Sequence, residues 1–351
     1  MYRASSNILR LIRFAFRAFS TNNPRFGKFQ RQANGLIRET LSAQLIAALP
    51  GNSKMKMQWY MAIAAWMCEL FNELHGRSST PEEQRTYLLS SATMAISDVL
   101  IDDVDSDPTR LELLMNPAES FVAKNSLEEA YLKFYRAFLG SLSESVEGET
   151  MKYYNLAYQE QINTLGQLDE LTPIADIDEV CRRKSGIGLL FFRAMIDVPV
   201  TQQEQTAWFE LGAFLQYCND VQDLYKDTSR GIRTFANSRP DLETVFVDLD
   251  VQRIKVFGLI GALPFDETHK SDSLFMFYTM YMVTLSKLKQ WIALCDDKFS
   301  LEQLMSLDKH KARLKSASWP SFWFCFDKLK GYQETWPFET PPFDFDELKK
   351  L

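Results

Sequence analysis

The feature that most constrains how this chain folds is a run of acidic and amide side chains near residue 220. Asn219, Asp223 and Asp227 stand at i, i+4 and i+8 in QYCNDVQDLYKD. On an α-helix they project within about 80° of one another, and Asp220 lies beside them. Such oxygen atoms repel each other unless a cation lies among them. The run therefore predicts either a metal site or a strained surface on one face of a helix.

A second acidic run has similar spacing. Asp98, Asp102 and Asp105 fall at i, i+4 and i+7 in SDVLIDDVDSD, whereas Asp103 points elsewhere. The residues before them are largely apolar, so we expect the first carboxylates to emerge from a buried helix. Buried carboxylates need partners. Two such helices facing each other across a bundle would hold hard cations such as Mg²⁺ between them.

The rest of the chain has helical periodicity and no convincing strand alternation. Ser126 with Glu129, and Thr201 with Glu204, have the spacing of a capping box that starts a helix. No linker rich in Pro, Gly or Ser interrupts the middle of the 351 residues. We therefore expect an all-α protein in which residues 39–351 form a single large antiparallel helical bundle.

Composition excludes several classes of protein. The five cysteines are an odd number without a CxxC pair, which argues against a disulfide framework or a zinc site and implies a reducing compartment. The three histidines lack the spacing of metal ligands. A net charge of −7, with no repeated basic face beyond the N-terminus, argues against a nucleic-acid partner.

Residues 1–38 form a separate basic segment. They contain eight Arg or Lys residues and no Asp or Glu, with apolar residues in between. Three interpretations remain open: a mitochondrial transit peptide, a helix in peripheral contact with an anionic membrane, or a helix that caps the bundle. No apolar run reaches the ~20 residues of a transmembrane helix, and the longest candidates, Trp59 to Cys68 and Leu274 to Leu285, suit core helices better. We expect a cytoplasmic or membrane-peripheral protein, or a mitochondrial one if the segment is a transit peptide.

The two acidic runs resemble the metal-binding motifs of class I isoprenoid (terpenoid) synthases, the all-helical family of prenyltransferases, terpene cyclases and squalene or phytoene synthases. Asn219, Asp223 and Asp227 fit the spacing of the cyclase metal triad. Asp98 with Asp102 fits the DxxxD form of squalene and phytoene synthases, and Asp102-Asp103 would fit the DDxx(x)D form of prenyltransferases. Helical geometry favours Asp98 with Asp102. In order and spacing, the resemblance spans residues 40–320.

The resemblance implies a bundle of the isoprenoid synthase type with a central active-site cavity and several Mg²⁺ ions. It assigns catalytic roles to Asp98, Asp102, Asn219, Asp223 and Asp227. The implied metal ligands are Asp98, Asp102, Asp103, Asn219, Asp220, Asp223 and Asp227. The implied ligands of a prenyl diphosphate substrate are Arg182, Arg183, Lys184, Lys226 and Arg230, although on spacing alone the basic triplet also fits a solvated helix face. Gly186 and Gly188 favour function there, because glycines inside a helix often mark a kink or a close backbone approach.

Among the reactions of this family, we favour a terpene synthase that ionises one linear prenyl diphosphate and then cyclises or quenches the carbocation. This reaction needs no second diphosphate site and fits the 219/223/227 triad best. Chain elongation is disfavoured, because Pro108-Thr109-Arg110 replaces the expected Arg pair. A squalene or phytoene type of condensation, and a noncatalytic helical subunit, remain the alternatives, and a homodimer is left open. Aromatic candidates for a cavity wall, each better explained by a plain core role, are Phe134, Tyr154, Tyr158, Phe191, Phe192, Phe214, Phe275 and Tyr278.

Overall fold

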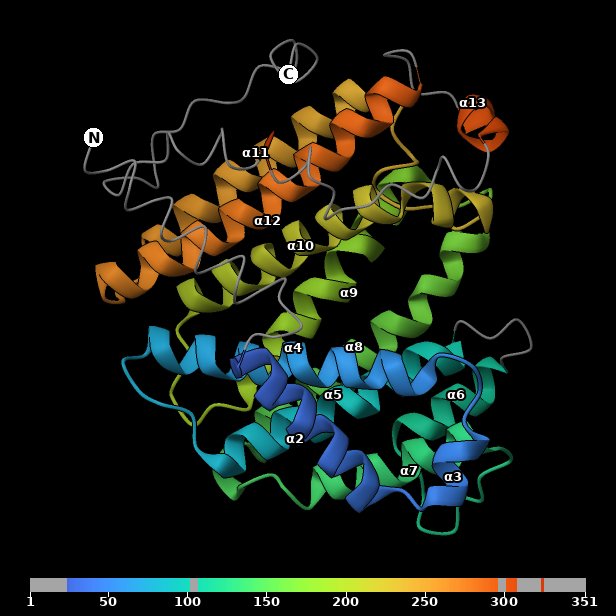
Figure 1. The fold of residues 1–351 in the computed structure, drawn as a ribbon, viewed down its shortest axis with the longest axis vertical. Coiled ribbons are helices and arrows are strands. Elements are labelled where there is room, and N and C mark those ends of the chain that lie inside the picture. The colour runs from blue at the N-terminus through green and yellow to red at the C-terminus, as the bar shows by residue number, and fades with distance from the viewer. Residues whose placement is uncertain (1–23, 102–106, 296–300, 308–322, 325–351) are drawn as a thin grey trace. The chain divides into compact units, whose positions relative to one another are not determined.

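Every regular element that the structure describes is a helix, which confirms the all-α prediction (Figure 1). The computed structural model describes residues 24–101, 107–295, 301–307 and 323–324. Residues 1–23, and the predicted ligands Asp102 and Asp103, lie outside this part of the chain. The helices divide into two compact units.

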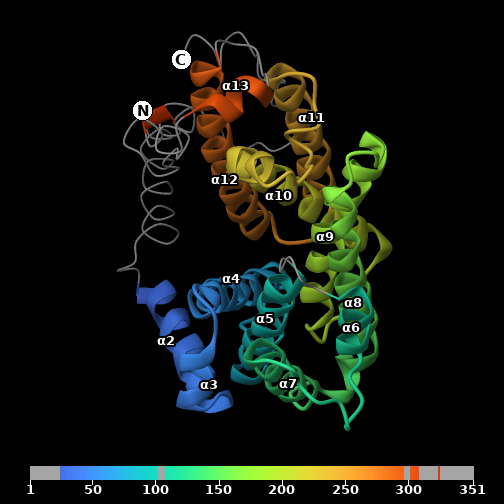
Figure 2. The same ribbon diagram turned by 90° about the vertical axis from the view of Figure 1, so that its right-hand side faces the viewer.

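The N-terminal unit is built around an antiparallel helix pair, α4 and α5, with α2, α7 and α8 packed against it, α3 packed on α7 and α6 packed on α8 (Figure 2). Leu190–Val200 also belongs to this unit. Its helices are α2 (Pro24–Thr40), α3 (Ala43–Ala48), α4 (Ser53–Leu74), α5 (Pro81–Ile101), α6 (Pro108–Met115), α7 (Ser126–Leu139) and α8 (Glu144–Asn163).

The C-terminal unit is built around α10, α11 and α12, which lie side by side in both views (Figures 1 and 2). Gln203 of α10 contacts the Ala262 carbonyl after α11, and Glu210 contacts Gln252, so α10 and α11 run antiparallel. This unit consists of η1 (Thr164–Leu168), α9 (Ile174–Ala194) as far as Leu189, α10 (Gln202–Ser229), α11 (Leu242–Gly261), α12 (Glu267–Leu294) and α13 (Leu301–Ser306).

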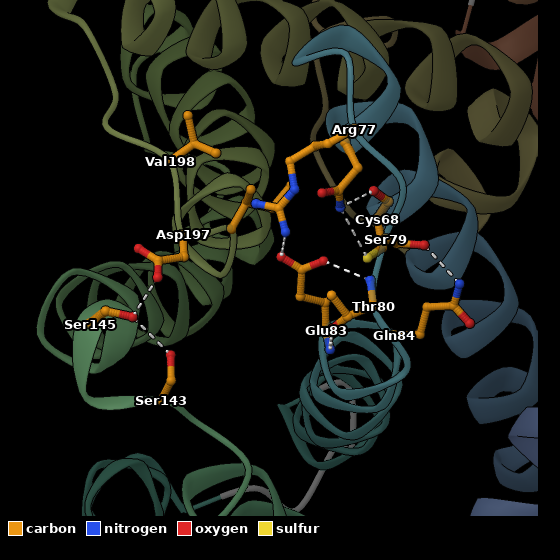
Figure 3. Close-up of polar contacts among 12 residues, drawn as sticks. Cys68, Arg77, Ser79, Thr80, Glu83, Gln84, Ser143, Ser145, Asp197 and Val198 are labelled. Carbon is orange, nitrogen blue, oxygen red and sulfur yellow. Dashed lines mark hydrogen bonds and ion pairs between the residues drawn. The ribbon is translucent and has the colours of Figure 1, made fainter.

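The turn between α4 and α5 is fixed by a reciprocal capping box that the sequence analysis missed (Figure 3). Thr80 Oγ1 accepts a hydrogen bond from the Glu83 amide at 3.1 Å, and Glu83 Oε2 accepts one from the Thr80 amide at 2.9 Å. Arg77 donates to Glu83 Oε1 at 2.5 Å, and Pro81 begins the helix. These contacts satisfy exposed amides at the helix start and fix where α5 begins.

Of the two helix starts predicted from capping boxes, one is confirmed and one is wrong by a residue. Thr201 caps α10, since its hydroxyl accepts from the Glu204 amide at 3.1 Å. The cap of α7 is Asn125, not Ser126. The Ser126 hydroxyl donates instead to the Ala48 carbonyl at 2.9 Å. Asn and Ser are equally good caps, so a carbonyl at the end of α3 decides between them.

Helices α9 and α10 cross in direct backbone contact. A Cβ atom added to Gly212 would lie 2.2 Å from the Ser185 carbonyl oxygen, and one added to Gly186 would lie 2.7 Å from the Phe209 ring. The close approach expected at Gly186 is therefore confirmed. Gly188 differs, because an added Cβ there would meet no heavy atom within 4 Å. The crossing fixes the basic triplet of α9 against the acidic helix α10.

The described part of the basic segment belongs to a folded helix. Residues 24–38 lie in α2, so the domain boundary expected at residue 38 falls inside it. Phe29, Ala33, Leu36 and Ile37 are buried there. In the described residues, no helix combines the length and apolarity that a membrane crossing requires. Four of the cysteines (Cys68, Cys181, Cys218 and Cys295) are buried and form no disulfide.

Candidate functional site

Helix α10 carries the 219/223/227 triad along one side, from the surface into the protein. Its core face holds buried residues such as Leu211, Phe214 and Val221, which fix the rotation of the helix. Asn219 is exposed, the Asp223 side chain is 35% exposed, and Asp227 is only 8% exposed. The three side chains thus form a polar stripe that ends on a buried carboxyl group.

Asp227 is the unusual member of the stripe. Burial raises the pKa of its carboxyl group to about 7, and the neighbouring Asp223 carboxylate raises it further. No side chain in the described part of the protein donates a hydrogen bond to it. An ionised carboxylate in such surroundings is costly unless a cation or a donor compensates it. The stripe is therefore short of positive charge at its buried end.

Lysines surround this pair of carboxylates. Lys226 Nζ lies 2.6 Å from Asp223 Oδ2. Burial lowers the pKa of Lys226, but the hydrogen bond to Asp223 and the charges of Asp223 and Asp227 together outweigh burial, and the net shift is upward. From α9, the charge of Lys184 lowers the pKa of Asp227. The structure therefore brings two of the predicted basic residues, Lys184 and Lys226, to the acidic stripe.

Asp220 has a different environment from its neighbours. It is buried, and its Oδ1 accepts from Gln216 Nε2 at 2.7 Å while Oδ2 accepts from the Phe235 amide at 3.1 Å. The Cys181 thiol also bonds to it. Burial raises the pKa of Asp220 to about 6. Because both oxygens have protein partners, Asp220 connects α10 to α9 and to the segment that follows α10.

The other predicted diphosphate ligands lie apart from the stripe or beside it. Arg182 pairs with Glu210 at 2.9 Å and with Glu179 at 3.6 Å, rather than with Asp223 or Asp227. Arg183 is partly exposed on α9. Arg230 is exposed at the C-cap of α10, directly after the stripe. Of these three, Arg230 is the one that sits at the same end of α10 as Asp227.

Asp98 occupies the last turn of α5, in the N-terminal unit. Its carboxylate forms an ion pair with Lys56 and accepts hydrogen bonds from the Tyr60 hydroxyl at 3.2 Å and from Gln161 Nε2. Lys56 and Tyr60 come from α4, and Gln161 comes from α8. Lys56, whose side chain is 29% exposed, is thus a charged partner of this carboxylate in the structure. Asp102, the residue paired with it in the predicted motif, lies outside the described residues.

The aromatic candidates for a cavity wall pack mainly into the cores of the two units. In the N-terminal unit the Tyr154 and Phe191 ring centroids lie 5.8 Å apart. In the C-terminal unit Phe214 lies 6.2 Å from Tyr281. Phe192 is partly exposed, whereas seven are buried: Phe134, Tyr154, Tyr158, Phe191, Phe214, Phe275 and Tyr278. The core role preferred for each from sequence therefore holds for those seven.

Helix α4 has an exposed apolar stripe that the sequence analysis did not predict. Met55, Trp59 and Ile63 stand at i, i+4 and i+8 and are 53%, 49% and 45% exposed. The stretch from residue 59 to residue 68 was expected to be a core helix, and that expectation is wrong for this face. The stripe lies beside Lys56 and Tyr60, the two α4 residues that contact Asp98.

The described residues contain no group of three His, Cys, Asp or Glu side chains placed to hold a metal ion. The α10 stripe instead offers two carboxylates and one amide. Comparison with known protein families and with curated proteins finds no match for the sequence. The all-helical fold and the α10 stripe are therefore the basis for assigning a function.

The two raised carboxyl pKa values predict a pH-dependent stability. The folded protein holds the Asp220 and Asp227 protons more tightly than the unfolded chain, whose Asp pKa is near 3.8. The stability that these two protonated groups give the folded state is therefore fully present below about pH 4, and it is lost as pH rises through about 6 and 7. The free energy of unfolding is measured with urea in the presence of EDTA. Relative to the wild type, that of Asp227→Asn should increase by on the order of 3 kcal/mol from pH 4 to pH 7. If the difference in the free energy of unfolding between variant and wild type stayed constant over this range, the prediction would be wrong.

Proposed function

We propose that this protein is a Mg²⁺-dependent class I terpene synthase that ionises a linear prenyl diphosphate and cyclises or quenches the carbocation. The observation that supports this most strongly is the Asp227 carboxyl group. It is buried, has a raised pKa, and lies one helical turn from Asp223. With Asn219, the two carboxylates form a set of oxygen ligands of the kind that Mg²⁺ prefers.

In this proposal the residues of the chain hold the diphosphate while its C–O bond breaks. Bound Mg²⁺ would neutralise the charge that builds up on the leaving group. Lys184, Lys226 and Arg230 supply further positive charge at the end of α10. Such charges act most strongly where they are fixed before the reaction starts. We propose that the Asp98 end of α5, with Asp102 and Asp103, supplies the second set of ligands in a central cavity of the isoprenoid synthase type.

The exposed stripe on α4 suits a hydrocarbon ligand. A prenyl diphosphate joins a long apolar chain to an anionic head group. Met55, Trp59 and Ile63 offer an apolar surface, and Trp59 also offers an aromatic face that stabilises positive charge. The adjoining Lys56 already forms an ion pair with Asp98. We propose that this stripe of the N-terminal unit is a contact surface for an apolar chain.

The direct test is turnover of defined substrates. Purified protein with Mg²⁺ is incubated with geranyl, farnesyl or geranylgeranyl diphosphate, and the organic extract is analysed by gas chromatography. A hydrocarbon or alcohol from one substrate supports the proposal. A product of doubled chain length would indicate the condensing alternative. Dependence on isopentenyl diphosphate would indicate elongation, and no product from any substrate would favour a noncatalytic subunit.

A further inference from the structure

Helix α11 has an apolar stripe on its exposed side. Val247, Val251 and Ile254 are 46%, 60% and 40% exposed, and Gly258 is partly exposed one turn further on. On an α-helix these four positions project within about 60° of one another. We call these four residues the α11 seam. The other side of α11 is buried, and α10 and α12 pack against this helix. The seam is therefore an apolar surface on a helix whose core face is already occupied.

The spacing within the α11 seam is typical of a helix that pairs with another helix. From residue 247 the steps to residues 251, 254 and 258 are four, three and four residues. Alternating steps of three and four place an apolar residue at each turn along the line where two helices pack at a shallow angle. Valine and isoleucine fill such a line, and at Gly258 an added Cβ would meet no heavy atom within 4 Å, so a neighbour can approach closely. The seam therefore fits a second helix.

Charged residues on one edge of the seam indicate which helix this is. Asp248 and Lys255 lie two turns apart on the same edge, and their side chains are 40% and 48% exposed. Asp248 Oδ2 lies 2.7 Å from Arg239 Nε, and Lys255 Nζ lies 2.8 Å from Glu210 Oε1. Even with these partners, both side chains still reach the surface. The edge thus presents a negative charge near one end of the seam and a positive charge near the other.

A second copy of α11 that runs antiparallel complements this edge. When Val251 of one copy packs against Ile254 of the other, all four seam residues of each copy meet seam residues of the second copy. In an antiparallel pair the matching edges face each other, so in this register Asp248 of each copy lies beside Lys255 of the other. A parallel pair would instead set like charges at the same level. The surface is therefore complementary to itself, as a two-fold symmetric interface requires.

We propose that two copies of this chain associate through the α11 seam as an antiparallel, two-fold symmetric homodimer. The apolar seam supplies most of the binding free energy, because exposed ion pairs contribute little. The pairs between Asp248 and Lys255 fix the register and the direction. One helix from each copy makes a small interface, so we expect a Kd on the order of micromolar. The inference does not depend on the proposed catalytic activity.

The first test is sedimentation velocity of the full-length protein over about 1 to 100 µM, the range in which a micromolar Kd is measured. The wild type should change from monomer to dimer as its concentration rises. Val251→Glu should raise the Kd by at least about 100-fold, because it buries an unpaired carboxylate in the middle of the interface. Val122→Glu is the matched control. It changes an exposed valine outside the seam in the same way and should dimerise as the wild type does.

The second test is disulfide trapping, which determines the direction of the two helices. An equal mixture of Val251→Cys and Ile254→Cys proteins should form a covalent dimer that contains one of each, detected by mass spectrometry. Val247→Cys alone should form none, because in the antiparallel register the two copies of residue 247 lie at opposite ends of the interface. The wild type, with its four described cysteines buried, is the baseline.

Several results would overturn the inference. They are a wild type that stays monomeric at every concentration, Val251→Glu that dimerises as well as the wild type, and an equal loss in Val122→Glu. Trapping of Val247→Cys with itself would overturn the antiparallel arrangement. A monomeric wild type that is more stable than Val251→Glu would mean that another segment of this chain covers the seam. Circular dichroism checks that each variant is folded, and Val251→Gln replaces Val251→Glu if that variant is not.

Discussion

Asp227→Asn should reduce Mg²⁺-dependent pyrophosphate release by about 10²- to 10³-fold, the range seen when one preorganised charge-stabilising group is removed from an active site. The amide keeps the size of the side chain but cannot supply the negative charge that a divalent cation needs at the buried end of the stripe. The measurement is the initial rate with the best prenyl diphosphate substrate over a range of Mg²⁺ concentrations. We expect that added Mg²⁺ will not restore the rate.

Two comparisons show whether the loss comes from the site. Asp176→Asn, in the exposed first turn of α9, should leave the rate unchanged. Without metal at pH 7, Asp227→Asn should be at least as stable as the wild type, because it removes a buried charge. A variant that unfolds more easily and also loses activity would point to a structural role for Asp227. A fully active variant would remove the main support for the proposed metal site.

Gly212→Ala should destabilise the protein by about 3 kcal/mol or more, near the upper end of the cost of overpacking. The new methyl group would lie 2.2 Å from the Ser185 carbonyl oxygen and 2.7 Å from the Gly186 Cα atom. Both are backbone atoms of a neighbouring helix, so no side-chain rotation relieves the overlap. The change in the free energy of unfolding is measured by urea denaturation followed by circular dichroism.

Gly148→Ala is the matched control for this substitution. Gly148 lies on the exposed face of α8, and an added Cβ there meets nothing within 4 Å. Since alanine favours a helix over glycine by up to about 1 kcal/mol, this variant should be slightly more stable than the wild type. If both variants changed stability by the same small amount, α9 and α10 would not be in the backbone contact described above.

The sequence predicted the parts of this structure that depend on local spacing. The triad of Asn219, Asp223 and Asp227 follows from the helical repeat, and Thr201 caps α10 because its partner is three residues away. The start of α7 was misplaced because the choice between Asn125 and Ser126 depends on a carbonyl 78 residues earlier in the chain. The local spacing of residues does not reveal a contact between residues so far apart in the chain.

In the candidate site, too, local spacing predicts some features, whereas others depend on contacts between distant parts of the chain. Asp220 and Asp223 are equivalent acidic residues in the sequence, yet Asp220 bonds to the Phe235 amide and to Cys181. The burial of Lys287 was also missed, because one lysine in a long helix looks like a solvated residue until α12 is packed against α10. The signal available was its position between Ser286 and Leu288, in a stretch that is otherwise mostly apolar.

The glycine crossing of α9 and α10 also limits how this protein can be re-engineered. Residues 186 and 212 touch main chain or a packed ring, so neither tolerates enlargement unless the two helices separate. Separation would shift Lys184 relative to Asp227 and stretch the bond from Ser185 to Gln216. Variant libraries of this protein should therefore leave this pair of positions constant, whereas the exposed side of α4 can gain or lose bulk without moving a helix.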